Sequence, residues 1–420
     1  MISNQKEGLI LTSASELFLG NVSKYEPIYS NEVPDSIVIR NGVIEAIGES
    51  SQILAEYTRS DFEIIDCTNK TICPSFVDSH THLVFAGNRS HELNLKIKGK
   101  SYLEIAKGGG GISYSVNQTR AATKEELVAL ALERLDEMLV HGTTTIEAKS
   151  GYGLNQEDEI KILEVIKEVN EKHPIDVIPT FLGCHVKPED FIGNQWEYIE
   201  SMILLLPEIK RRNLAEYVDI WTDQGAFSIE ESEHFLKQAL DYDFKLRVHA
   251  DEMENVGAAL MAANMGSTSA DHLLKAEAIS ARTMADAGVV ANLLPGTPFV
   301  MMSKNYANYG MFKDAGVTVA LSSDFNPNCY LTNMQFVVAL GCFMMKMLPE
   351  EALSAATYGG AKSLNREQQI GSLDLGMNAD VLILDLPSVS SLPYQYAVNH
   401  TNMIIKNGKM IVQNKERIRA

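Results

Sequence analysis

Short apolar runs alternate with amphipathic stretches from about residue 71 onward, and no other property of the chain narrows the possible folds as much. The runs are rich in β-branched residues, as buried strands are, and the stretches between them carry apolar residues at helical spacing. Eight strands are expected, at Thr71–Phe76, Thr143–Ala148, Asp176–Leu182, Tyr217–Trp221, Lys245–Val248, Ser267–Ala270, Val289–Leu293 and Val317–Ser322. This alternation predicts an α/β fold, a closed (β/α)8 barrel of the TIM type.

The two ends of the chain show a different pattern. Short alternating runs such as Ser36–Arg40 and Val43–Ile47 occur in the first 70 residues, and Ala379–Leu384 and Met403–Val412 resemble them. We therefore expect a small β-sandwich-like domain built from residues 1–70 and 371–420, and a catalytic barrel over residues 71–370.

The charge of the chain limits the class of ligand. It has 36 Lys and Arg residues against 55 Asp and Glu residues, a formal net charge of −19. Proteins that bind nucleic acid or anionic membranes gain affinity by placing positive charge against phosphates. We therefore expect neither partner, although a basic residue in a cleft still allows a small anionic substrate.

Several features predict a cytoplasmic protein. Residues Met1–Gly8 are mostly polar or charged where a secretory signal has an apolar core, and no apolar run reaches membrane-spanning length. The five cysteines are scattered and form no CxxC pair, which argues against a disulfide framework or a zinc ribbon.

A homodimer is the default expectation for the oligomeric state.

Two histidines directly after the first expected strand are the first candidates for chemistry. In Asp78-Ser-His80-Thr-His82 the imidazoles are two residues apart, so in an extended segment both point the same way and reach one metal ion. The same spacing also occurs in solvated or core histidines. The position favours a metal site, because side chains at the carboxyl ends of barrel strands converge.

Further polar residues follow other strands: His185 after strand three, His249 at the end of strand five, His272 after strand six and Asp324 at the end of strand eight. The remaining histidines lie in helices, connections or the terminal domain, and we expect them to be structural: His91, His141, His173, His234 and His400.

One divalent ion, zinc or iron, is the expected cofactor. Its predicted ligands are His80, His82, His249 and Asp324, a set that leaves a position for water. Strand four ends at Asp223 without a lysine that could bridge two ions after carboxylation, which favours a single metal. A bound ion lowers the pKa of its water to about 7, so we expect Asp324 to accept the proton and His272 to orient the water.

Several motifs together resemble the imidazolonepropionase family of amidohydrolases. In order along the chain they are PSFVDSHTHLVFAGNR, EAKSGYGL, TFLGCH, HADE, SADHL, LLPGT and SSDFNP. The resemblance implies the same four metal ligands and the hydrolysis of the cyclic amide of 4-imidazolone-5-propanoate to N-formimidoyl-L-glutamate in histidine catabolism.

The resemblance also implies that Arg89, Tyr152, His185, Glu252 and Asn326 contact the substrate. Arg89 would take the substrate carboxylate in a fork, Glu252 would carry a proton to the leaving nitrogen, and His185 would bind the developing oxyanion. A solvated Arg89, a packed Tyr152 and a structural Glu252 are the competing interpretations.

The chain departs from this family after SSDFNP. The family usually continues with Gly-Ser-Ser, whereas this chain has Asn328-Cys329-Tyr330. Asn328 can adopt the left-handed backbone that glycine favours, and Cys329 replaces a serine with a weaker donor. We expect both to bind the substrate, although the departure puts recognition of its carboxylate in question.

Two other functions stay open. A different amidohydrolase-type enzyme, such as a nucleobase deaminase, would share the metal ligands but release ammonia. A non-catalytic barrel scaffold would be expected to lack some of those ligands, and none is missing. The segment Gly108–Gly111 lacks the context of a phosphate-binding loop, so we expect a mobile loop near the site instead.

Overall fold

The computed structural model describes residues 6–21, 34–57, 61–100 and 102–419. Its contacts divide the chain into two compact units. One comprises Met1–Val77, Asp136–Thr144 and Asn333–Ala420, and the other comprises Asp78–Leu135 and Thr145–Thr332. The domain boundaries expected from the sequence, at residues 70 and 370, stay a prediction.

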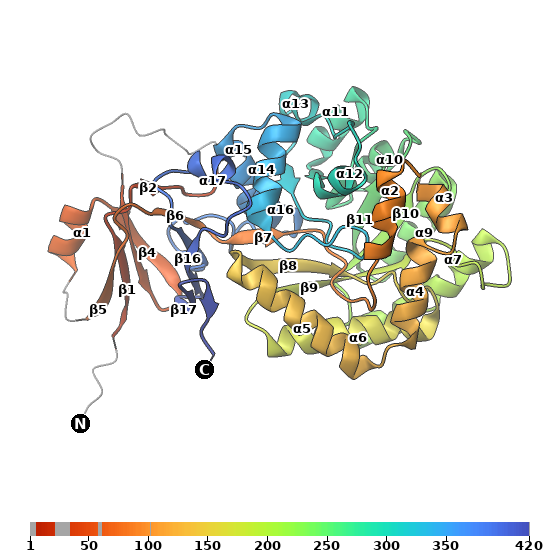
Figure 1. Cartoon of the computed structure of the whole chain (residues 1–420), viewed down its shortest axis with the longest axis horizontal. Coiled ribbons are helices and arrows are strands. Elements are labelled where there is room, and N and C mark those ends of the chain that lie inside the picture. The colour runs from red at the N-terminus through yellow and green to blue at the C-terminus, as the bar shows by residue number, and fades with distance from the viewer. Residues whose placement is uncertain (1–5, 22–33, 58–60, 101, 420) are drawn as a thin grey trace. The chain divides into compact units, whose positions relative to one another are not determined.

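Both ends of the chain contribute to the first unit, as expected (Figure 1). A four-stranded sheet has the order β4-β3-β1-β5, with β1 Gly8–Thr12, β3 Ser36–Arg40, β4 Val43–Gly48 and β5 Phe62–Asp66. A six-stranded sheet has the order β18-β17-β16-β15-β6-β2. Its strands are β2 Glu16–Leu17, β6 Thr71–Pro74, β15 Val381–Leu384, β16 Thr401–Lys406, β17 Lys409–Gln413 and β18 Glu416–Arg417.

One apolar core joins these two sheets. Leu11 and Ile39 of the first sheet belong to the same buried cluster as Ile72, Val381 and Ile405 of the second. The strands carry such residues at alternate positions, which places them on one face of each sheet. The helices of this unit are α1 Ser50–Glu56, α14 Met334–Met345, α15 Pro349–Ser354, the π-helix η3 Ala355–Gly359, α16 Gly360–Ser363 and α17 Ser391–Tyr394.

The predicted barrel is confirmed. An eight-stranded sheet has the order β14-β13-β12-β11-β10-β9-β8-β7. Its strands are β7 Phe76–Asp78, β8 Thr143–Lys149, β9 Asp176–Cys184, β10 Tyr217–Thr222, β11 Lys245–Ala250, β12 Ser269–His272, β13 Val290–Leu293 and β14 Val319–Leu321. The segments after the two outer strands, β7 and β14, close the barrel, because Thr81 forms a parallel bridge with Phe325 and the N–H of Asp324 donates to the carbonyl oxygen of His80.

The first expected strand is wrong as a single barrel strand. Thr71–Phe76 divides into β6, which pairs with β15 in the terminal sheet, and β7, which lies in the barrel. Pro74 ends β6 because it has no N–H with which to continue the ladder. Both halves are apolar and buried, so the hydrophobic pattern contains no boundary between them.

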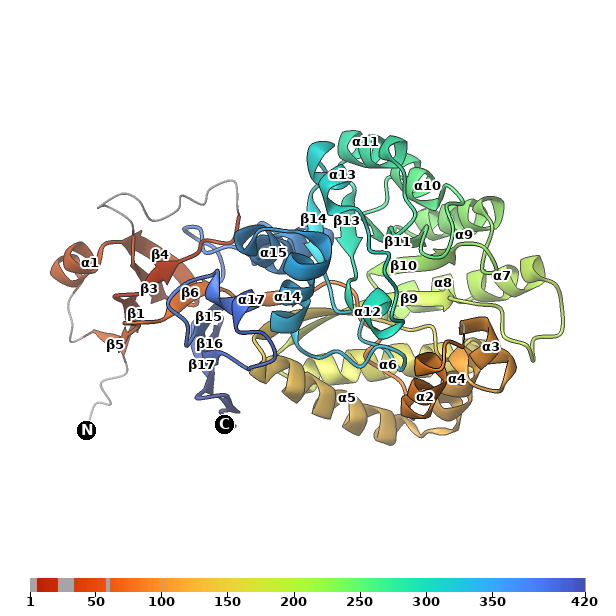
Figure 2. The ribbon, with the colours of Figure 1, turned by 45° about the horizontal axis from the view of Figure 1, so that its top comes forward.

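Helices follow most barrel strands and cover the outside of the sheet (Figure 2). Helix α9, Ile229–Asp241, packs on β10 and β11, and it begins with a capping box between Ser228 and Glu231. Helix α5, Lys124–Val140, begins after Thr123, whose hydroxyl accepts the N–H of Glu126 at 3.2 Å.

The other helices of the second unit are the 3₁₀ helix η2 Ser90–Glu92, α2 Leu93–Ile97, α3 Tyr102–Lys107, α4 Gly111–Ala121, α6 Gln156–Lys172, α7 Gln195–Ile203, α8 Leu206–Arg212, α10 Ala258–Asn264, α11 Ala278–Ala287, α12 Gly296–Val300 and α13 Tyr309–Asp314.

Candidate active site

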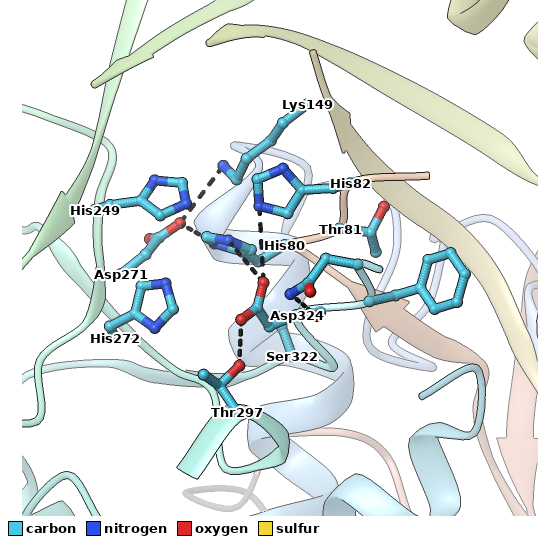
Figure 3. A network of polar contacts seen from close by, with 12 residues as sticks. His80, Thr81, His82, Lys149, His249, Asp271, His272, Thr297, Ser322 and Asp324 are labelled. Carbon is cyan, nitrogen blue, oxygen red and sulfur yellow. Dashed lines mark hydrogen bonds and ion pairs between the residues drawn. The ribbon is translucent and has the colours of Figure 1, made fainter. Parts of the chain in front are cut away.

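A buried cluster of histidines and one carboxylate lies at the carboxyl ends of the barrel strands (Figure 3). His80 and His82 follow β7, His249 lies in β11 and Asp324 follows β14. The exposed fraction of each of these side chains is 4% or less. Oδ1 of Asp324 lies 3.5 Å from Nε2 of His80 and 3.7 Å from Nε2 of His82.

The spacing of these atoms suits a metal ion. One ligand atom from each of His80, His82 and His249 lies within 4.8 Å of the others, and the same holds for His80, His272 and Asp324. Two ligands that each lie ~2.1 Å from one tetrahedral ion are ~3.4 Å apart, close to the distances from Asp324 to the two histidines. The residues predicted as metal ligands are therefore brought together by the fold.

The hydrogen-bonding state of the rings tests whether a cation fits. Among the described residues, Nε2 of His80, Nδ1 of His82 and Nε2 of His249 are buried without a hydrogen-bond partner. Each unpaired buried polar atom costs ~1–3 kcal/mol. A cation between the rings would accept lone pairs from this cluster, so the donor set fits a first-row metal ion.

A carboxylate behind His80 sets the tautomer of its ring. Nδ1 of His80 lies 2.6 Å from Oδ2 of Asp271, which leaves the lone pair on Nε2, toward the cluster. Asp271 is itself held by the hydroxyl of Ser269 at 2.6 Å and by the guanidinium of Arg247 at 3.1 Å. Asp219 has the same relation to His249, because its Oδ2 lies 2.9 Å from Nδ1 of that ring.

A buried lysine connects these two carboxylates. Nζ of Lys149 donates to Asp219 at 2.8 Å and to Glu147 at 2.7 Å, and it lies 3.7 Å from Asp271. Although burial raises the pKa of both aspartates, neighbouring groups outweigh it. For Asp219 these groups are His249 and Lys149, for Asp271 they are Arg247 and Lys149, and the net shift of each pKa is downward. The two cations Lys149 and Arg247 face three carboxylates, so this layer carries an excess of negative charge that suits a cation above it.

Three histidines of the cluster are neutral. Burial is the main cause that lowers the pKa of His80, His82 and His272 well below 6.5, and neighbouring positive groups lower it further. A neutral imidazole keeps the lone pair that a metal needs.

A cavity above the cluster brings together most of the residues expected to contact a substrate. It is lined by Arg89, Tyr152, His185, Glu252, Asn326 and Asn328, and also by residues that the sequence did not single out, among them Ile112, Trp221, Met253, Thr297 and Met301. Thr297 in α12 donates a short hydrogen bond to Oδ2 of Asp324, which fixes the orientation of that carboxylate (Figure 3).

Two aromatic side chains form one wall of this cavity. His185 stacks on His82, with ring centroids 5.1 Å apart, and its Nδ1 hydrogen-bonds the carbonyl oxygen of Gly151 at 2.9 Å. Nε2 of His185 is therefore the ring nitrogen left to meet a ligand. Burial lowers the pKa of His185 to about 3. Tyr152 contacts the edge of His82 at 5.6 Å.

Glu252 stands on a loop that Asp223 holds in place. The carboxylate of Asp223 accepts the backbone N–H groups of Glu252 at 2.7 Å, Met253 at 2.8 Å and Glu254 at 3.1 Å. Oε1 of Glu252 lies 3.7 Å from Nδ1 of His272. Burial, followed by the charges of Asp324 and Asp223, raises the pKa of Glu252 to about 8. The carboxyl group is thus suited to hold a proton near neutral pH.

The residues of the loop after Asp324 differ in whether their side chains reach the cavity. The side chain of Asn326 accepts the N–H groups of Asn328 and Cys329 and donates to the carbonyl oxygen of Asp324, so it braces the loop. Cys329 is fully buried and is not among the residues that line the cavity; its thiol faces the carbonyl oxygen of Ser323 at 3.7 Å. Substrate binding by Asn326 and Cys329 stays a prediction.

The other histidines, the cysteines and the glycine-rich segment considered in the sequence can also be located. None of the five histidines expected to be structural is among the cavity-lining residues. The five cysteines are unpaired, and all but Cys342 are buried. Gly111 of the glycine-rich segment begins α4, and the next residue, Ile112, lines the cavity. Movement of this segment stays a prediction.

The supporting residues Lys149, Asp219, Asp271 and Thr297 were not predicted. A signal for some of them was present: Glu147 and Lys149, and also Arg247 and His249, are two apart at the ends of expected strands. Residues two apart in a strand share a face, so these pairs point inward together.

In the part of the chain that the structure describes, no helix combines the length and the apolar character needed to span a membrane.

Comparison with known proteins gives a consistent result. The profile of the amidohydrolase family matches residues 71–412. An imidazolonepropionase of Brevibacillus brevis is 43% identical over 381 residues, which cover 90% of each chain. The imidazolonepropionase of Treponema denticola is 44% identical over 380 residues, 90% of this chain and 92% of the relative. That of Bacillus cereus is 40% identical over 408 residues, 97% and 93% of the two chains.

Solved structures of similar fold are more distant in sequence. An adenosine deaminase from Xanthomonas campestris with bound zinc has a TM-score of 0.74 at 16% identity and covers 99% of this chain and 95% of its own. Atrazine chlorohydrolase from Arthrobacter aurescens in complex with zinc has a TM-score of 0.75 at 16% identity, with 98% and 97% coverage. At this identity the likeness concerns the fold alone.

Proposed function

Because the chain belongs to the imidazolonepropionase family of amidohydrolases, we propose that it hydrolyses the cyclic amide of 4-imidazolone-5-propanoate to N-formimidoyl-L-glutamate with one divalent metal ion, zinc or iron. The observation that carries the proposal is a single cavity in which the His80, His82, His249 and Asp324 cluster faces Arg89, Glu252 and His185.

The metal would be held by these four residues, with Asp271 and Asp219 orienting two of the rings. When bound, such an ion supplies Lewis acidity and lowers the pKa of a coordinated water. Asp324 would take the proton of the attacking water, and the Thr297 hydroxyl, which donates to Oδ2 of Asp324, would keep this carboxylate in position. His272, close to Asp324, would orient that water.

The remaining cavity residues bind the substrate and move protons. Arg89 pairs with the propanoate carboxylate, and Tyr152 packs against the ring. His185 presents Nε2 to the oxygen on which negative charge develops. Glu252, whose carboxyl group tends to hold a proton, gives it to the ring nitrogen as the carbon–nitrogen bond breaks.

The partner and the location of the enzyme follow from the same function. A small anionic substrate is its expected partner, and a cytoplasmic location accords with the five unpaired cysteines. A homodimer is proposed only because it is the commonest arrangement of soluble oligomers in general.

The decisive test mixes purified protein of known metal content with freshly prepared 4-imidazolone-5-propanoate and follows the ultraviolet absorbance of the imidazolone. We expect the absorbance to decay with formation of N-formimidoyl-L-glutamate, and the decay to stop after chelation and to return when zinc or iron is added. A stable absorbance with one metal bound per chain would contradict the proposal, and release of ammonia from a nucleobase would point to a deaminase.

A further inference from the structure

Three charged side chains follow one another on the segment that leads away from the cavity. Arg89 precedes η2, Glu92 ends η2 and Lys96 lies in α2. Their spacing of three and four residues places them on one face of these short helices. Two of the three, Glu92 and Lys96, belong to no motif from which the function was inferred.

Glu92 offsets the charge of Arg89. Its two carboxylate oxygens accept from Nε and Nη2 of Arg89 at 2.9 and 2.8 Å, and both side chains are almost completely buried. Oε1 of Glu92 also accepts the N–H of Gly111, the first residue of α4, at 2.7 Å. The guanidinium is therefore held rigidly, and part of its positive charge is already compensated before any ligand binds.

Lys96 is compensated less completely, because Glu92 acts on its charge only from a distance. Nζ of Lys96 donates to Oδ1 of Asn328 at 2.5 Å, so its partner is a neutral amide. Within the residues that the structure describes, Lys96 forms no ion pair with a carboxylate. The side chain is half-buried, and burial together with the charge of Arg89 lowers its pKa, although the charge of Glu92 acts in the opposite direction. An ammonium group beside a second cation is an arrangement that an anion would stabilise.

The contact with Asn328 brings this charge to the cavity. Asn328 and Arg89 both line it, and the amide nitrogen of Asn328 lies 3.6 Å from the sulfur of Met301, another lining residue. Lys96 thus stands directly behind Asn328, close enough to Arg89 for the two charges to act on each other.

We propose that Lys96 is a specificity-determining residue that supplies, with Arg89, the positive charge by which the cavity selects a substrate carrying a carboxylate. The proposal rests on the proposed function, since it concerns the same cavity and the same substrate class. It also accounts for Asn328: the side chain that replaces the expected glycine holds the ammonium group at the cavity wall.

The competing role for Lys96 is purely structural, a tie between α2 and the loop that carries Asn328. The two roles differ in what they do to ligands of different charge. Loss of a structural contact would lower the affinity for all ligands alike. Loss of a charge would lower the affinity for the anionic ligand and leave that for a neutral analogue unchanged.

The experiment measures binding by calorimetry of two probes that share a ring, 3-(imidazol-4-yl)propanoate and its neutral amide, 3-(imidazol-4-yl)propanamide. The metal-loaded wild type should bind the acid more tightly than the amide. Lys96→Met should lose about tenfold in affinity for the acid, with the amide unchanged, because one screened ion pair of this kind is lost. Lys96→Gln, which can keep a contact with Asn328, should behave in the same way, whereas Lys96→Arg should retain most of the preference.

Lys98→Met is the matched control, since Lys98 is an exposed lysine two residues away and should leave both affinities unchanged. The proposal would be overturned if Lys96→Met and Lys96→Gln lost affinity equally for the acid and the amide, or if neither affinity changed. A wild type that does not bind the acid more tightly than the amide would also overturn it. Binding is measured without turnover, so failure of the wild type to hydrolyse 4-imidazolone-5-propanoate would count against the proposed function alone.

Discussion

The chemistry of this site depends on single residues that contact the histidines from behind. Asp271 receives the ring N–H of His80, and Asp219 lies against His249. Such partners orient an imidazole and increase its basicity, so they influence metal affinity without touching the metal. Lys149 and Arg247 keep these carboxylates in place and charged.

Replacement of Asp271 by Asn should weaken metal binding by ~10–100-fold, because a neutral amide, which can also turn its NH2 group toward His80, replaces the charged acceptor that sets the tautomer of the ring. Competition with a chromophoric chelator measures the affinity directly. Asp286→Asn, at an exposed position in α11, is the control. If the two variants bind metal equally well, Asp271 has no role in positioning His80.

Glu252 is a second single residue on which the chemistry depends, through its one carboxyl group. Glu252→Gln should lower kcat by ~100-fold or more while the metal content stays unchanged, since the amide cannot donate and recover a proton. Steady-state kinetics and metal analysis test this together. Glu254→Gln is the control, because Glu254 is exposed on the same loop; near-normal turnover of Glu252→Gln would remove the proposed proton transfer.

At the scale of the element, the ends of the strands and the loops that follow them build the site. His272 and Asp324 both adopt a left-handed backbone, with φ of 74° and 50°. This conformation costs a non-glycine residue ~1–3 kcal/mol, so the surrounding structure must impose it. The parallel bridge between Thr81 and Phe325 does so for Asp324, because it fixes the segments after β7 and β14 against each other.

The loop that carries Tyr152 depends on the first turn of α6. The buried carboxylate of Glu159 accepts the N–H groups of Gly153 and Leu154 at 2.8 Å and of Gly151 at 3.0 Å. A side chain at Gly153 would come within 2.6 Å of the backbone of α6, so the loop lies directly on the helix. The position of Tyr152 is thus a property of the whole helix–loop unit.

Glu159→Gln should lower the free energy of unfolding by ~1–3 kcal/mol, because the NH2 group that replaces one carboxylate oxygen cannot accept a hydrogen bond from a backbone N–H. Urea denaturation measures the loss. Glu157→Gln, exposed in the same helical turn, should have little effect. Equal stability of the two variants would show that the Glu159 contacts do not hold the loop.

At the scale of the whole molecule, burial of neutral histidines links stability to pH. The pKa of His185 is lowered to about 3 by burial, while an unfolded histidine titrates near 6.5. Below pH 6.5 the unfolded chain therefore binds a proton that the folded chain does not, so this residue costs stability as the pH falls and costs nothing well above 6.5.

His185→Gln removes this dependence. Relative to the variant, the wild type should lose about 2 kcal/mol of unfolding free energy between pH 7 and pH 5. Chemical denaturation at the two pH values provides the measurement, with His234→Gln, at a partly exposed position, as the control. A difference that does not change with pH would mean that His185 takes up its proton equally in the folded and unfolded chains.

The amino-acid sequence alone determined the barrel, the small terminal β domain and the set His80, His82, His249 and Asp324. These features are local: apolar periodicity marks strands and helices, and residues at the ends of parallel strands meet wherever the sheet closes. The family resemblance added Arg89, Tyr152, His185 and Glu252, and the fold places all four on one cavity.

Only the tertiary structure decided the rest. The division of Thr71–Phe76 between two sheets depends on partners more than 300 residues away, such as β15. The pairing of His80 with Asp271 and of Lys96 with Asn328 joins residues 191 and 232 positions apart. Cys329 does not line the cavity, because its thiol lies against the carbonyl oxygen of Ser323, a contact that the motif does not predict. Local pattern carries no information about such contacts, since they form when distant segments are packed together and each buried charge must find a partner.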